Sequence, residues 1–564
     1  MKSINGINWQ INSIPERFIL KNQQNFNISY LLSKVFLDNK YTDEEIHNSI
    51  YKTPIQEINY QNQDFENAAK LVSECLNNKK KILIFGDYDV DGYSSTYLLY
   101  DFFINLKLNC DYFIPDRLLD GYGPNLSLLR KLIGKSSYDL VIFVDCGSNS
   151  IDEINYLENC GLKSIVIDHH QIHKHKIFNR SVIINPLKKN SPKKYGSLCA
   201  TSLTYFFIKY LEKKLIGKKK IDNNKYLFFS AIATICDQMP LRDYNKKIVI
   251  NGLRNFDFNK FYNFKKLIKI NRKLTSTDIG FILGPILNSA SRTGYSDLPF
   301  KFLIEKKNNV TDKIVTKLIN LNDKRKKIQS KTINLLKVNL DEIKNQVIFK
   351  YVENINEGLL GIIASNFVEI YNKPGFILTN SGDFIKCSSR SIKNYDVGYI
   401  FHLAIKKKII INGGGHSMAG GCILKKNKLN DLKIFLNMNY NKRFYNVRNT
   451  KYYTSIQNFE SLLTFAKEDL QNLEPFGNDN ASPLFLVKNN KIIKLKVINS
   501  THLHLIIKNK NNKSCKAMAF NAVGRKLGEC LMNCKKEIDL IVQINNNIIH
   551  KNSDFNLIIK DAIV

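Results

Sequence analysis

Three short apolar segments, each followed at once by carboxylates, constrain the fold of this chain more than any other feature. They are KKILIFGDYDVDG (80–92), YDLVIFVDCGSNS (138–150) and LKSIVIDHH (162–170). Amphipathic stretches such as 95–106 and 151–160 separate them. Continuous apolar strands that alternate with helices are typical of a parallel sheet buried on both faces. The pattern predicts an α/β domain whose acidic residues gather at the carboxyl edge of the sheet, where such sheets bind ligands.

Further patterned regions follow this one. Residues 200–340 are mainly helical in pattern, and a long exposed connecting helix is predicted over 320–343. A second α/β pattern begins near 346–352 and holds the glycine cluster 412–421. Five short strand-like runs within 450–564 fit a small β-barrel, for which an oligonucleotide-binding (OB) fold is the leading candidate. The predicted units are a helical leader (1–78), the first α/β domain (79–240), a helical region with the connecting helix (241–344), the second α/β domain (345–449) and the barrel (450–564).

Composition excludes several classes of protein. Hydrophobic residues make up 44% of the 564 residues, which is enough for buried cores and excludes a disordered chain. No apolar run approaches the ~18–20 residues of a membrane helix, and no apolar segment of a signal peptide follows the first lysine. The 11 cysteines form no CxxC pair, and their odd number argues against a disulfide framework. We therefore expect a cytoplasmic protein without membrane contact.

The chain is strongly basic, with a formal net charge of +34. Such a charge attracts polyanions such as nucleic acids. However, the chain is crowded with Lys, Asn and Ile, and an AT-rich genome gives this composition whatever the function. The charge alone therefore leaves the question of nucleic-acid binding open.

The first acidic segment contains three alternating carboxylates, Asp87, Asp89 and Asp91. If the chain stays extended after its strand, alternate side chains share one face and all three carboxylates point into one small volume. Anions so close together repel one another unless cations neutralise them, and oxygen ligands suit Mg²⁺ or Mn²⁺. The alternative is an acidic turn that binds water or lysine.

The neighbouring segments add further candidate ligands. Asp145 follows the second strand, and Asp168, His169 and His170 follow the third. Asp237 ends another apolar run, where capping a helix or strand is the alternative role. Imidazole beside carboxylate favours Mn²⁺ over Ca²⁺, and the lack of nearby thiolates argues against structural zinc. Four converging segments favour two ions that share ligands, an arrangement suited to phosphoryl displacement.

These residues resemble a known family. The segments that resemble the DHH phosphoesterase superfamily are GDYDVDG (86–92), PDRLLDGYG (115–123), VDCGSNS (144–150), DHH (168–170) and ICDQMPL (235–241). The segments similar to its RecJ branch, which comprises bacterial exonucleases specific for single-stranded DNA, are GPILNSASRTG (284–294), EGLLGIIAS (357–365), CSSRSI (387–392), GGGHSMAGG (413–421) and LEPFGNDNASPLF (473–485). The resemblance implies a parallel-sheet DHH domain, a second α/β DHH-associated domain and a C-terminal OB-fold barrel.

The resemblance also implies roles for individual residues. The implied ligands of two Mn²⁺ or Mg²⁺ ions are Asp89, Asp91, Asp145, His169 and Asp237, with Asp87 as a further ligand or a neighbour of the ligands. Asp145 is expected to bridge the two ions, and Asp168 to orient His169 through its ring N–H. His170 is expected to face the scissile phosphate and to stabilise charge or protonate the leaving oxygen.

Further residues are implied to bind the substrate backbone. The implied phosphate-binding residues are Arg117, Arg292 and Arg390, together with Gly414, Gly415 and His416 of the glycine cluster. Guanidinium groups bind phosphate oxygens with paired bonds, and glycine-rich backbone can form an anion-binding nest. Surface ion pairs and a purely structural turn are the alternatives. The chain departs from the RecJ pattern at Asn356, where relatives usually have a histidine.

The function implied is that of a metal-dependent exonuclease. It would degrade single-stranded DNA from the 5′ end to 5′-mononucleotides in repair and recombination, with the barrel holding the strand. The implied partners are single-stranded DNA, a helicase and a single-strand-binding protein, and the chain is expected to be a monomer. One alternative is a DHH phosphodiesterase of short RNAs or cyclic dinucleotides, against which the terminal barrel argues. The other is a catalytically inactive replication scaffold, which should have lost metal ligands that this chain retains.

Overall fold

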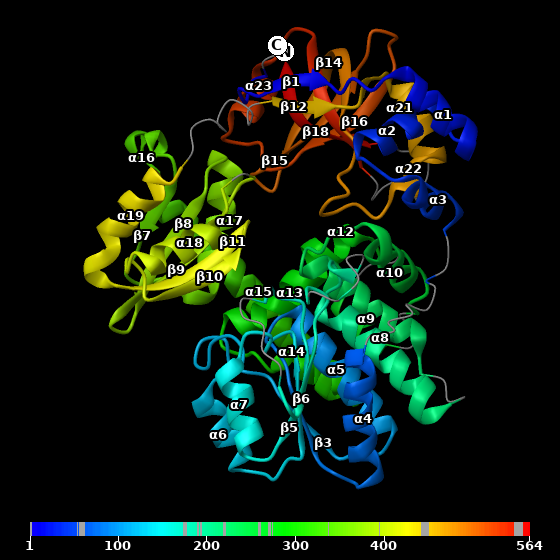
Figure 1. The fold of residues 1–564 in the computed structure, drawn as a ribbon. Coiled ribbons are helices and arrows are strands. Elements are labelled where there is room, and N and C mark those ends of the chain that lie inside the picture. The colour runs from blue at the N-terminus through cyan, green and yellow to red at the C-terminus, as the bar shows by residue number, and fades with distance from the viewer. Residues whose placement is uncertain are drawn as a thin grey trace.

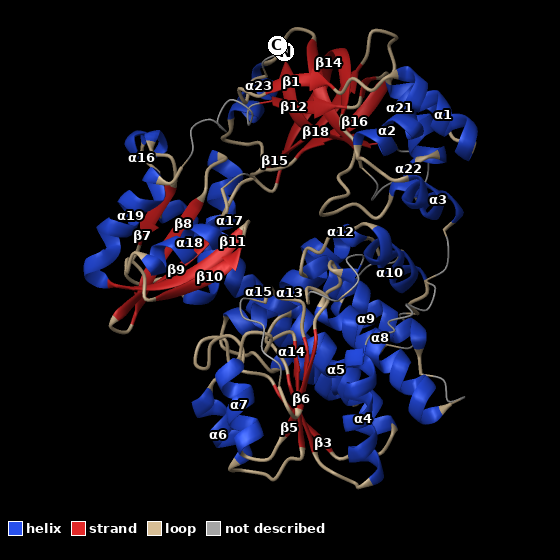
Figure 2. Ribbon diagram, viewed as in Figure 1, coloured by secondary structure: helices blue, strands red, loops and turns tan. Residues whose placement is uncertain are grey.

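The protein is described by a computed structural model in which three sheet-containing bodies are arranged around a helical centre (Figure 1). The residues described are 3–52, 55, 63–172, 178–188, 191, 195–217, 221–257, 261–268, 272, 274–336, 338–393, 395–440, 450–545 and 556–563. The predicted boundary between residues 449 and 450 borders a segment outside these ranges. Figure 2 shows that helices flank the two lower sheets, whereas strands dominate the upper body.

The first sheet is parallel throughout, as predicted, and its strands lie in the order β3-β2-β4-β5-β6. The strands are β2 (Ile82–Phe85), β3 (Cys110–Phe113), β4 (Leu140–Val144), β5 (Lys163–Ile167) and β6 (Ser181–Ile184). Alternate residues of a strand pack in two different hydrophobic cores: Ile82 and Ile84 lie in one, whereas Leu83 and Phe85 lie in the other. The covering helices are α4 (Gln63–Asn77), α5 (Val90–Asn105) and α8 (Ala200–Leu211) on the first face, and α6 (Leu126–Ile133) and α7 (Ile151–Asn159) on the second. Burial on both faces explains the continuous apolar strands.

A helical region joins the first sheet to the second body. Its main helices are α9 (Asn223–Cys236), α10 (Asp243–Arg254), α13 (Gly284–Arg292), α14 (Leu298–Ile304) and α15 (Asn308–Leu335). The connecting helix predicted over 320–343 begins earlier, because Val315 and Leu318 already anchor α15 in the first core. It also ends earlier, and a separate short helix, α16 (Leu340–Lys344), follows. Within the described ranges, no helix is both long and apolar enough to cross a membrane.

The second sheet is mixed, with the order β10-β11-β9-β8-β7. Its strands are β7 (Ile348–Tyr351), β8 (Gly375–Ser381), β9 (Phe384–Arg390), β10 (Asn412–His416) and β11 (Ala419–Lys425). The helices packed with them are α17 (Leu360–Tyr371), α18 (Val397–Lys406) and α19 (Leu429–Met438). The glycine cluster therefore forms an edge strand, β10, and the start of β11, rather than the glycine-rich turn that the sequence suggested.

The third body contains the five predicted strands, and pairing of β14 with β17 closes them into a barrel. The strands are β14 (Phe485–Ile498), β15 (His502–Lys508), β16 (Ser514–Ala519), β17 (Ile538–Ile544) and β18 (Asn556–Ile563). Two short helices, α21 (Phe459–Glu468) and α22 (Leu470–Leu473), precede the barrel and share its core. A short strand, β13 (Ser455–Ile456), pairs with the start of β14.

The predicted helical leader is not a separate unit, because its elements join two different bodies. Strand β1 (Asn8–Ile11) pairs in parallel with β12 (Thr450–Tyr453), beside the barrel. Helices α1 (Glu16–Phe26), α2 (Tyr30–Asp38) and α3 (Asp43–Tyr51) lie against the barrel body, whereas α4 packs on the first sheet. The barrel body is thus built from both ends of the chain, which lie together at the top of Figure 1.

Candidate metal centre

The loop after β2 begins the candidate site. Asp87 is buried, and Asp89 caps α5 with Oδ1, which accepts hydrogen bonds from the backbone N–H groups of Asp91 and Gly92 at 2.9 and 3.1 Å. The chain therefore turns into a helix at Asp89, and the predicted extended alternation of three carboxylates is wrong. A strong N-cap residue outweighs the strand pattern at this point. The turn nevertheless brings the three carboxylates to the same edge of the sheet.

Asp91 is fixed by the first turn of α8. Its Oδ2 accepts the N–H of Ala200 at 2.8 Å, and its Oδ1 accepts the N–H and hydroxyl of Thr201 at 2.7 and 2.6 Å. Helix N-termini favour negative charge. The end of α8 therefore holds this carboxylate in one orientation, with Oδ2 3.7 Å from Nε2 of His169.

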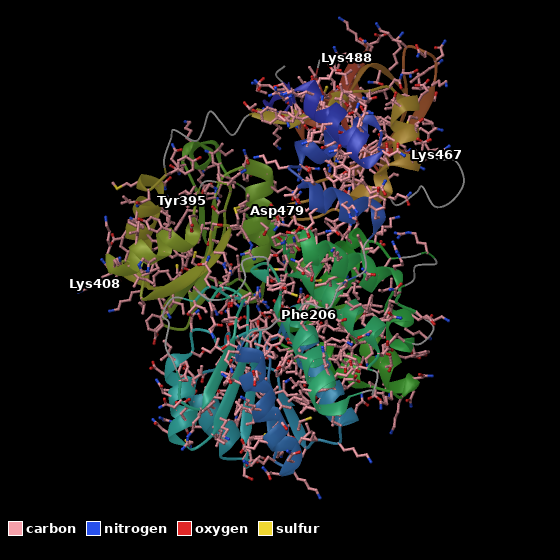
Figure 3. The ribbon with its side chains drawn as sticks, turned by 45° about the vertical axis from the view of Figure 1, so that its right-hand side comes forward. Phe206, Tyr395, Lys408, Lys467, Asp479 and Lys488 are labelled. Carbon is pink, nitrogen blue, oxygen red and sulfur yellow. The ribbon has the colours of Figure 1, made fainter. Side chains whose placement is uncertain are left out.

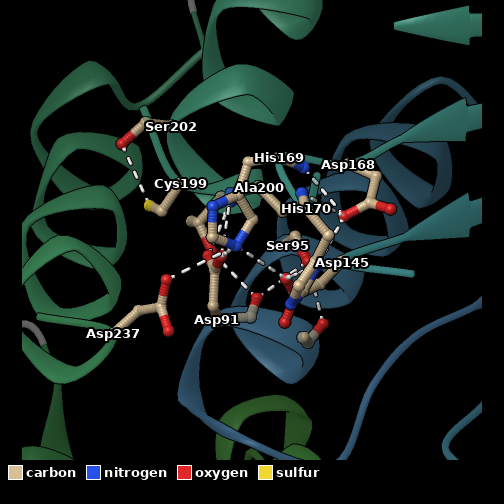
Figure 4. A network of polar contacts seen from close by, with 12 residues as sticks. Asp91, Ser95, Asp145, Asp168, His169, His170, Cys199, Ala200, Ser202 and Asp237 are labelled. Atoms are coloured by element: carbon tan, nitrogen blue, oxygen red, sulfur yellow. Dashed lines mark hydrogen bonds and ion pairs between the residues drawn. The ribbon is translucent and has the colours of Figure 1, made fainter. Parts of the chain in front are cut away.

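Asp145 follows β4 and lies at the centre of the cluster. Its backbone adopts φ 62°, a left-handed conformation that is uncommon for a residue with a side chain. Such conformations are found at functional sites, where the surrounding structure enforces them. Oδ1 of Asp145 is 3.3 Å from Nε2 of His169, and Oδ2 of Asp237 is 3.4 Å from the same nitrogen. Figure 4 shows the His169 ring pointing between these carboxylates.

Several polar atoms of this cluster are buried without a hydrogen-bond partner among the described residues. Among the described residues, Oδ1 of Asp87, Oδ1 of Asp145 and Nε2 of His169 are buried and have no hydrogen-bond partner. Burial and neighbouring carboxylates raise the pKa of Asp87, Asp145 and Asp237 well above the ordinary value, and burial lowers the pKa of His169. Uncompensated buried anions are costly, whereas a bound cation reverses this electrostatic balance.

The donor atoms form three sets that fit divalent cations. In each set the ligand atoms lie within 4.8 Å of one another; the sets are Asp87–Asp89–Asp145, Asp91–His169–Asp237 and Asp145–His169–His170. Carboxylate oxygens with imidazole are the donors that Mn²⁺ and Mg²⁺ sites use. The structure therefore brings all six predicted metal-binding residues together, and Asp145 belongs to two of the three sets.

Asp168 contacts a different histidine from the one predicted. Its Oδ1 lies 2.7 Å from Nδ1 of His170 and accepts the backbone N–H groups of His169 and His170 at 2.8 and 3.1 Å. The backbone wraps around Asp168, which leaves the His170 ring near the carboxylate and turns the His169 ring toward the acidic cluster. Burial lowers the pKa of His170, but the hydrogen bond and charge of Asp168 outweigh it and raise this pKa to about 9.

Tyr122 also belongs to the site, although its role was not inferred from the sequence. Its hydroxyl donates to the backbone O of Asp145 at 3.0 Å and lies 3.1 Å from Nδ1 of His170. Burial and the nearby Asp168 raise its pKa well above the ordinary value, so the phenol stays protonated. The sequence signal for Tyr122 is its position in the segment 115–123, which also contains Arg117.

The predicted arginines gather beside the acidic cluster. Arg292 donates from Nη1 to the backbone O of Gly358 at 2.9 Å, Arg390 donates to the backbone O of Ser389 at 2.9 Å, and the Arg117 guanidinium lies 4.8 Å from the centre of the Tyr88 ring. Burial and repulsion from Arg117, Arg390 and Arg325 lower the pKa of Arg292 to about 9.

Such mutual repulsion indicates a site that favours an anion. Arg325, on α15, was not predicted, because nothing in its local sequence separates it from neighbouring basic residues.

The glycine strand of the second sheet reaches the same region. The ring of His416 lies 5.9 Å from that of His170, with an angle of 25° between the planes. Gly415 adopts φ 146°, and a Cβ there would lie 2.2 Å from the backbone O of Ala419. A Cβ on Gly414 would meet no atom within 4 Å. The exposed edge of β10 is therefore open backbone beside the metal centre, where a ligand can approach closely.

Asn356 has a local structural role. Its side chain caps the short helix Glu357–Leu359 by accepting the N–H of Gly358 at 2.9 Å. Gly358 in turn accepts from Arg292, and a Cβ on Gly358 would lie 2.7 Å from the backbone O of Arg292. The residue that replaces the usual histidine thus shapes the turn that holds Arg292.

Three known domain families match this chain, one for each of its sheet-containing bodies. Residues 81–234 match the DHH family, N-terminal domain; residues 344–442 match the DHHA1 domain; and residues 459–561 match the RecJ OB domain. These three matches occur in the order in which the bodies follow one another in the chain. The chain therefore combines a DHH, a DHHA1 and a RecJ OB domain and is similar to RecJ proteins.

Individual RecJ proteins are similar over most of this chain. It is 26% identical over 523 residues to the single-stranded-DNA-specific exonuclease RecJ of Bacillus subtilis, covering 90% of this chain and 64% of that protein. It is 25% identical to the RecJ of Thermus thermophilus, covering 74% of this chain and 61% of that protein. The chain thus spans somewhat less than two thirds of the length of these relatives.

A solved RecJ structure has the same fold. The crystal structure of RecJ in complex with Mn²⁺ from Thermus thermophilus superposes with a TM-score of 0.80 at 20% identity, covering 99% of this chain and 79% of that one. The predicted architecture, a parallel-sheet domain, a second α/β domain and a C-terminal OB-fold barrel, is confirmed.

Proposed function

We propose that this chain is a metal-dependent exonuclease that degrades single-stranded DNA from its 5′ end to 5′-mononucleotides. The observation that carries the proposal is the set of buried, unpartnered donors at Asp87, Asp145 and His169, which lies beside an arginine cluster. Divalent cations and a phosphate backbone are the ligands that would balance the charges of these two clusters. RecJ relatives are named as single-stranded-DNA-specific exonucleases, which supports this substrate.

Two ions fit the donor set. Asp87, Asp89 and Asp145 would hold one ion, whereas Asp91, His169 and Asp237 would hold the other. Asp145 would contact both, since its Oδ1 lies 3.3 Å from Nε2 of His169. When bound, Mn²⁺ or Mg²⁺ supplies Lewis-acid polarisation of the phosphoryl oxygens and activation of the attacking water.

The remaining residues position the substrate. Asp168 holds the His170 ring at the edge of the metal centre, where this ring can stabilise charge or give a proton to the leaving oxygen. Arg292, fixed by Gly358, and Arg117, placed over Tyr88, would bind phosphate oxygens. Arg390 and the open edge at Gly414–His416 would contact the same backbone from the second α/β domain.

The barrel offers a surface for the rest of the strand. Lys496 pairs with His504 across strands and Lys494 with Ile506, which in turn pairs with Lys516. All three lysines are exposed. Lysines interleaved with flat or apolar side chains suit a sequence-tolerant grip on phosphates and bases.

End-labelled DNA tests this function. A 5′-labelled single strand should release labelled mononucleotide first when Mn²⁺ or Mg²⁺ is present, and EDTA should abolish the release. A blunt duplex should resist, because the proposed phosphate path beside the metal centre would admit a single backbone, and a 5′ overhang should restore cutting as far as the junction. Equal initial rates on duplex and single strand would refute the strand selectivity. Faster hydrolysis of short RNAs or cyclic dinucleotides than of DNA would favour a DHH phosphodiesterase.

The cellular setting is also part of the proposal. We expect roles in DNA repair and recombination, with a helicase and a single-strand-binding protein supplying the substrate, and action as a monomer. The 11 cysteines, all within the described residues, form no disulfide, which suits a reducing compartment and supports a cytoplasmic location. Size-exclusion chromatography of the full chain with and without a single strand tests the oligomeric state.

A further inference from the structure

The turn that carries Asp237 has an unusual backbone. Asp237 ends α9, and the next residue, Gln238, adopts φ 54°. The N–H of Met239 donates to Thr234 O at 3.0 Å and that of Gln238 to Ile235 O at 3.1 Å, the bond pattern of a Schellman helix end. Glycine normally occupies the left-handed position of this motif, because a Cβ is disfavoured there. Contacts from outside the helix would therefore stabilise Gln238 in this conformation.

Asn478, which belongs to the barrel body, binds both sides of this turn. Its Nδ2 donates to the backbone O of Gln238 at 2.7 Å, and its own backbone O accepts the N–H of Leu241 at 2.8 Å. The two bonds span the segment 238–241 from a residue 240 positions further along the chain. The first of these bonds fixes the backbone carbonyl of Gln238, which points away from the helix when Gln238 is left-handed.

The turn that presents Asn478 is itself rigid. Gly477 and Asn480 exchange backbone hydrogen bonds at 3.0 and 3.2 Å, and the Asn480 side chain donates to Leu473 O and Pro475 O. A Cβ on Gly477 would lie 2.7 Å from Cδ1 of Leu241, so glycine permits close docking. Asp479, at the tip of this turn, lies between the barrel body and the helical region in Figure 3.

We propose that Asn478 is a positioning residue for Asp237: it holds the Gln238 turn left-handed and thereby aims the Asp237 carboxylate into the metal centre. This inference rests on the proposed metal-binding role of Asp237. It makes the barrel body part of the metal centre, since one of its side chains shapes the backbone that carries a ligand. Residues that orient metal ligands from behind typically contribute ~10–100-fold to metal affinity or activity.

Titration of the metal-free full chain with Mn²⁺, followed by electron paramagnetic resonance without DNA, tests the proposal. Asn478→Ala should weaken Mn²⁺ binding by about tenfold and lower kcat on a trinucleotide, with KM little changed. Asn478→Asp keeps the volume but places a carboxylate against the Gln238 carbonyl, and it should lose at least as much affinity. Asn472→Ala is the matched control, because that residue lies in the same body and contacts the helical region through its backbone O, which accepts from Lys246.

A rescue variant separates positioning from general damage. Gln238→Gly adopts the left-handed conformation unaided, so Asn478→Ala combined with Gln238→Gly should return Mn²⁺ affinity to within about threefold of wild type. Wild-type affinity in both Asn478 variants, or a loss that Gln238→Gly does not restore, would overturn the positioning role. A wild-type chain that binds no Mn²⁺ would instead refute the proposed function, so the two failures are distinguishable.

Discussion

The first sheet and the barrel use five strands each, but they distribute charge in opposite ways. Strands β2 and β4 are buried along their whole length, so polar residues appear only beyond their ends, where Asp87 and Asp145 lie. In β15 and β16 buried residues alternate with more exposed ones, so polar side chains such as His504 and Lys516 lie along the strands. A sheet covered on both faces thus concentrates function at one edge, whereas a half-exposed sheet spreads it over a face.

The largest effect should follow from removing the shared carboxylate at the sheet edge. Asp145→Asn keeps the side-chain shape but removes a charge from two of the three donor sets. Because metal ions stabilise several kcal/mol of transition-state charge, turnover should fall at least ~1000-fold. DNA binding, measured by fluorescence anisotropy, should persist because the barrel is unchanged.

Asp139→Asn is the matched control, since Asp139 precedes the opposite end of β4 and accepts the N–H of Lys81. Near-normal cleavage by Asp145→Asn would contradict the two-ion site.

The second largest loss of activity should follow from a change in the arginine cluster. Arg292→Lys keeps the positive charge but loses the planar group that donates to Gly358 and can grip a phosphate with two bonds. We expect kcat/KM to fall by about 100-fold, the effect typical of losing one charge-stabilising donor. Single-turnover cleavage of a short oligonucleotide measures it. Arg130→Lys, on the surface of α6, should be silent, and equal rates for the two variants would remove Arg292 from the phosphate path.

Substitutions on the exposed face of the barrel should weaken the binding of long strands only. Replacing Lys494, Lys496 and Lys516 together by Gln would remove three of the proposed phosphate contacts, so the slope of log affinity against log salt should become shallower by about 2. A trinucleotide should be cleaved at the wild-type rate. Deletion of the barrel is a poorer test, because Asn478 and its docking turn would be lost with it.

The corresponding control replaces Lys70, Lys131 and Lys135 by Gln, three exposed lysines of the first body. If both triple variants flattened the salt dependence equally, the barrel would not be the strand-holding surface.

The smallest effect is expected where the helical region contacts the barrel body. Lys246 is buried, and its Nζ donates to the Tyr41 hydroxyl at 3.2 Å, Ser49 Oγ at 2.8 Å and Asn472 O at 3.2 Å. Burial, with a smaller contribution from Arg242, lowers the pKa of Lys246 to about 7. The unfolded chain holds this proton up to about pH 10.4, so folding releases it at intermediate pH, and stability should rise with pH between these values.

Lys246→Met removes this dependence. The variant should be relatively more stable than wild type at pH 6, and its advantage should shrink by about 2–3 kcal/mol at pH 9. Fluorescence of Trp9, the single tryptophan, follows unfolding of the barrel body. A difference between the proteins that does not change with pH would show that Lys246 keeps its ordinary pKa in the folded chain.

Much of this organisation could be predicted from the sequence, because burial leaves a regular pattern. Strands buried on both faces are continuous apolar runs, and those preceding Asp87, Asp145 and Asp168 identified the sheet and the carboxylates at its edge together. The same logic placed the five barrel strands.

What could not be predicted depends on contacts between distant segments. That Asp89 caps a helix, that Asp168 pairs with His170 and that Asn478 binds Gln238 follow from backbone geometry that no local pattern encodes. The sequence predicts an independent leader over helices α1–α3, because only a narrow apolar stripe, such as Leu32, Val35 and Phe36 on α2, packs on the barrel core.

The joining of both chain ends in one body has a consequence for synthesis. Nε1 of Trp9 donates to Oδ2 of Asp561 at 2.8 Å, across 552 positions. At roughly 5–20 residues per second, the apolar stripe of α2 leaves the ribosome tens of seconds before its barrel partners are made. The two α/β domains can fold in that interval, while the stripe stays exposed to solvent or to a chaperone. The barrel body is therefore completed only after both α/β domains have been synthesised.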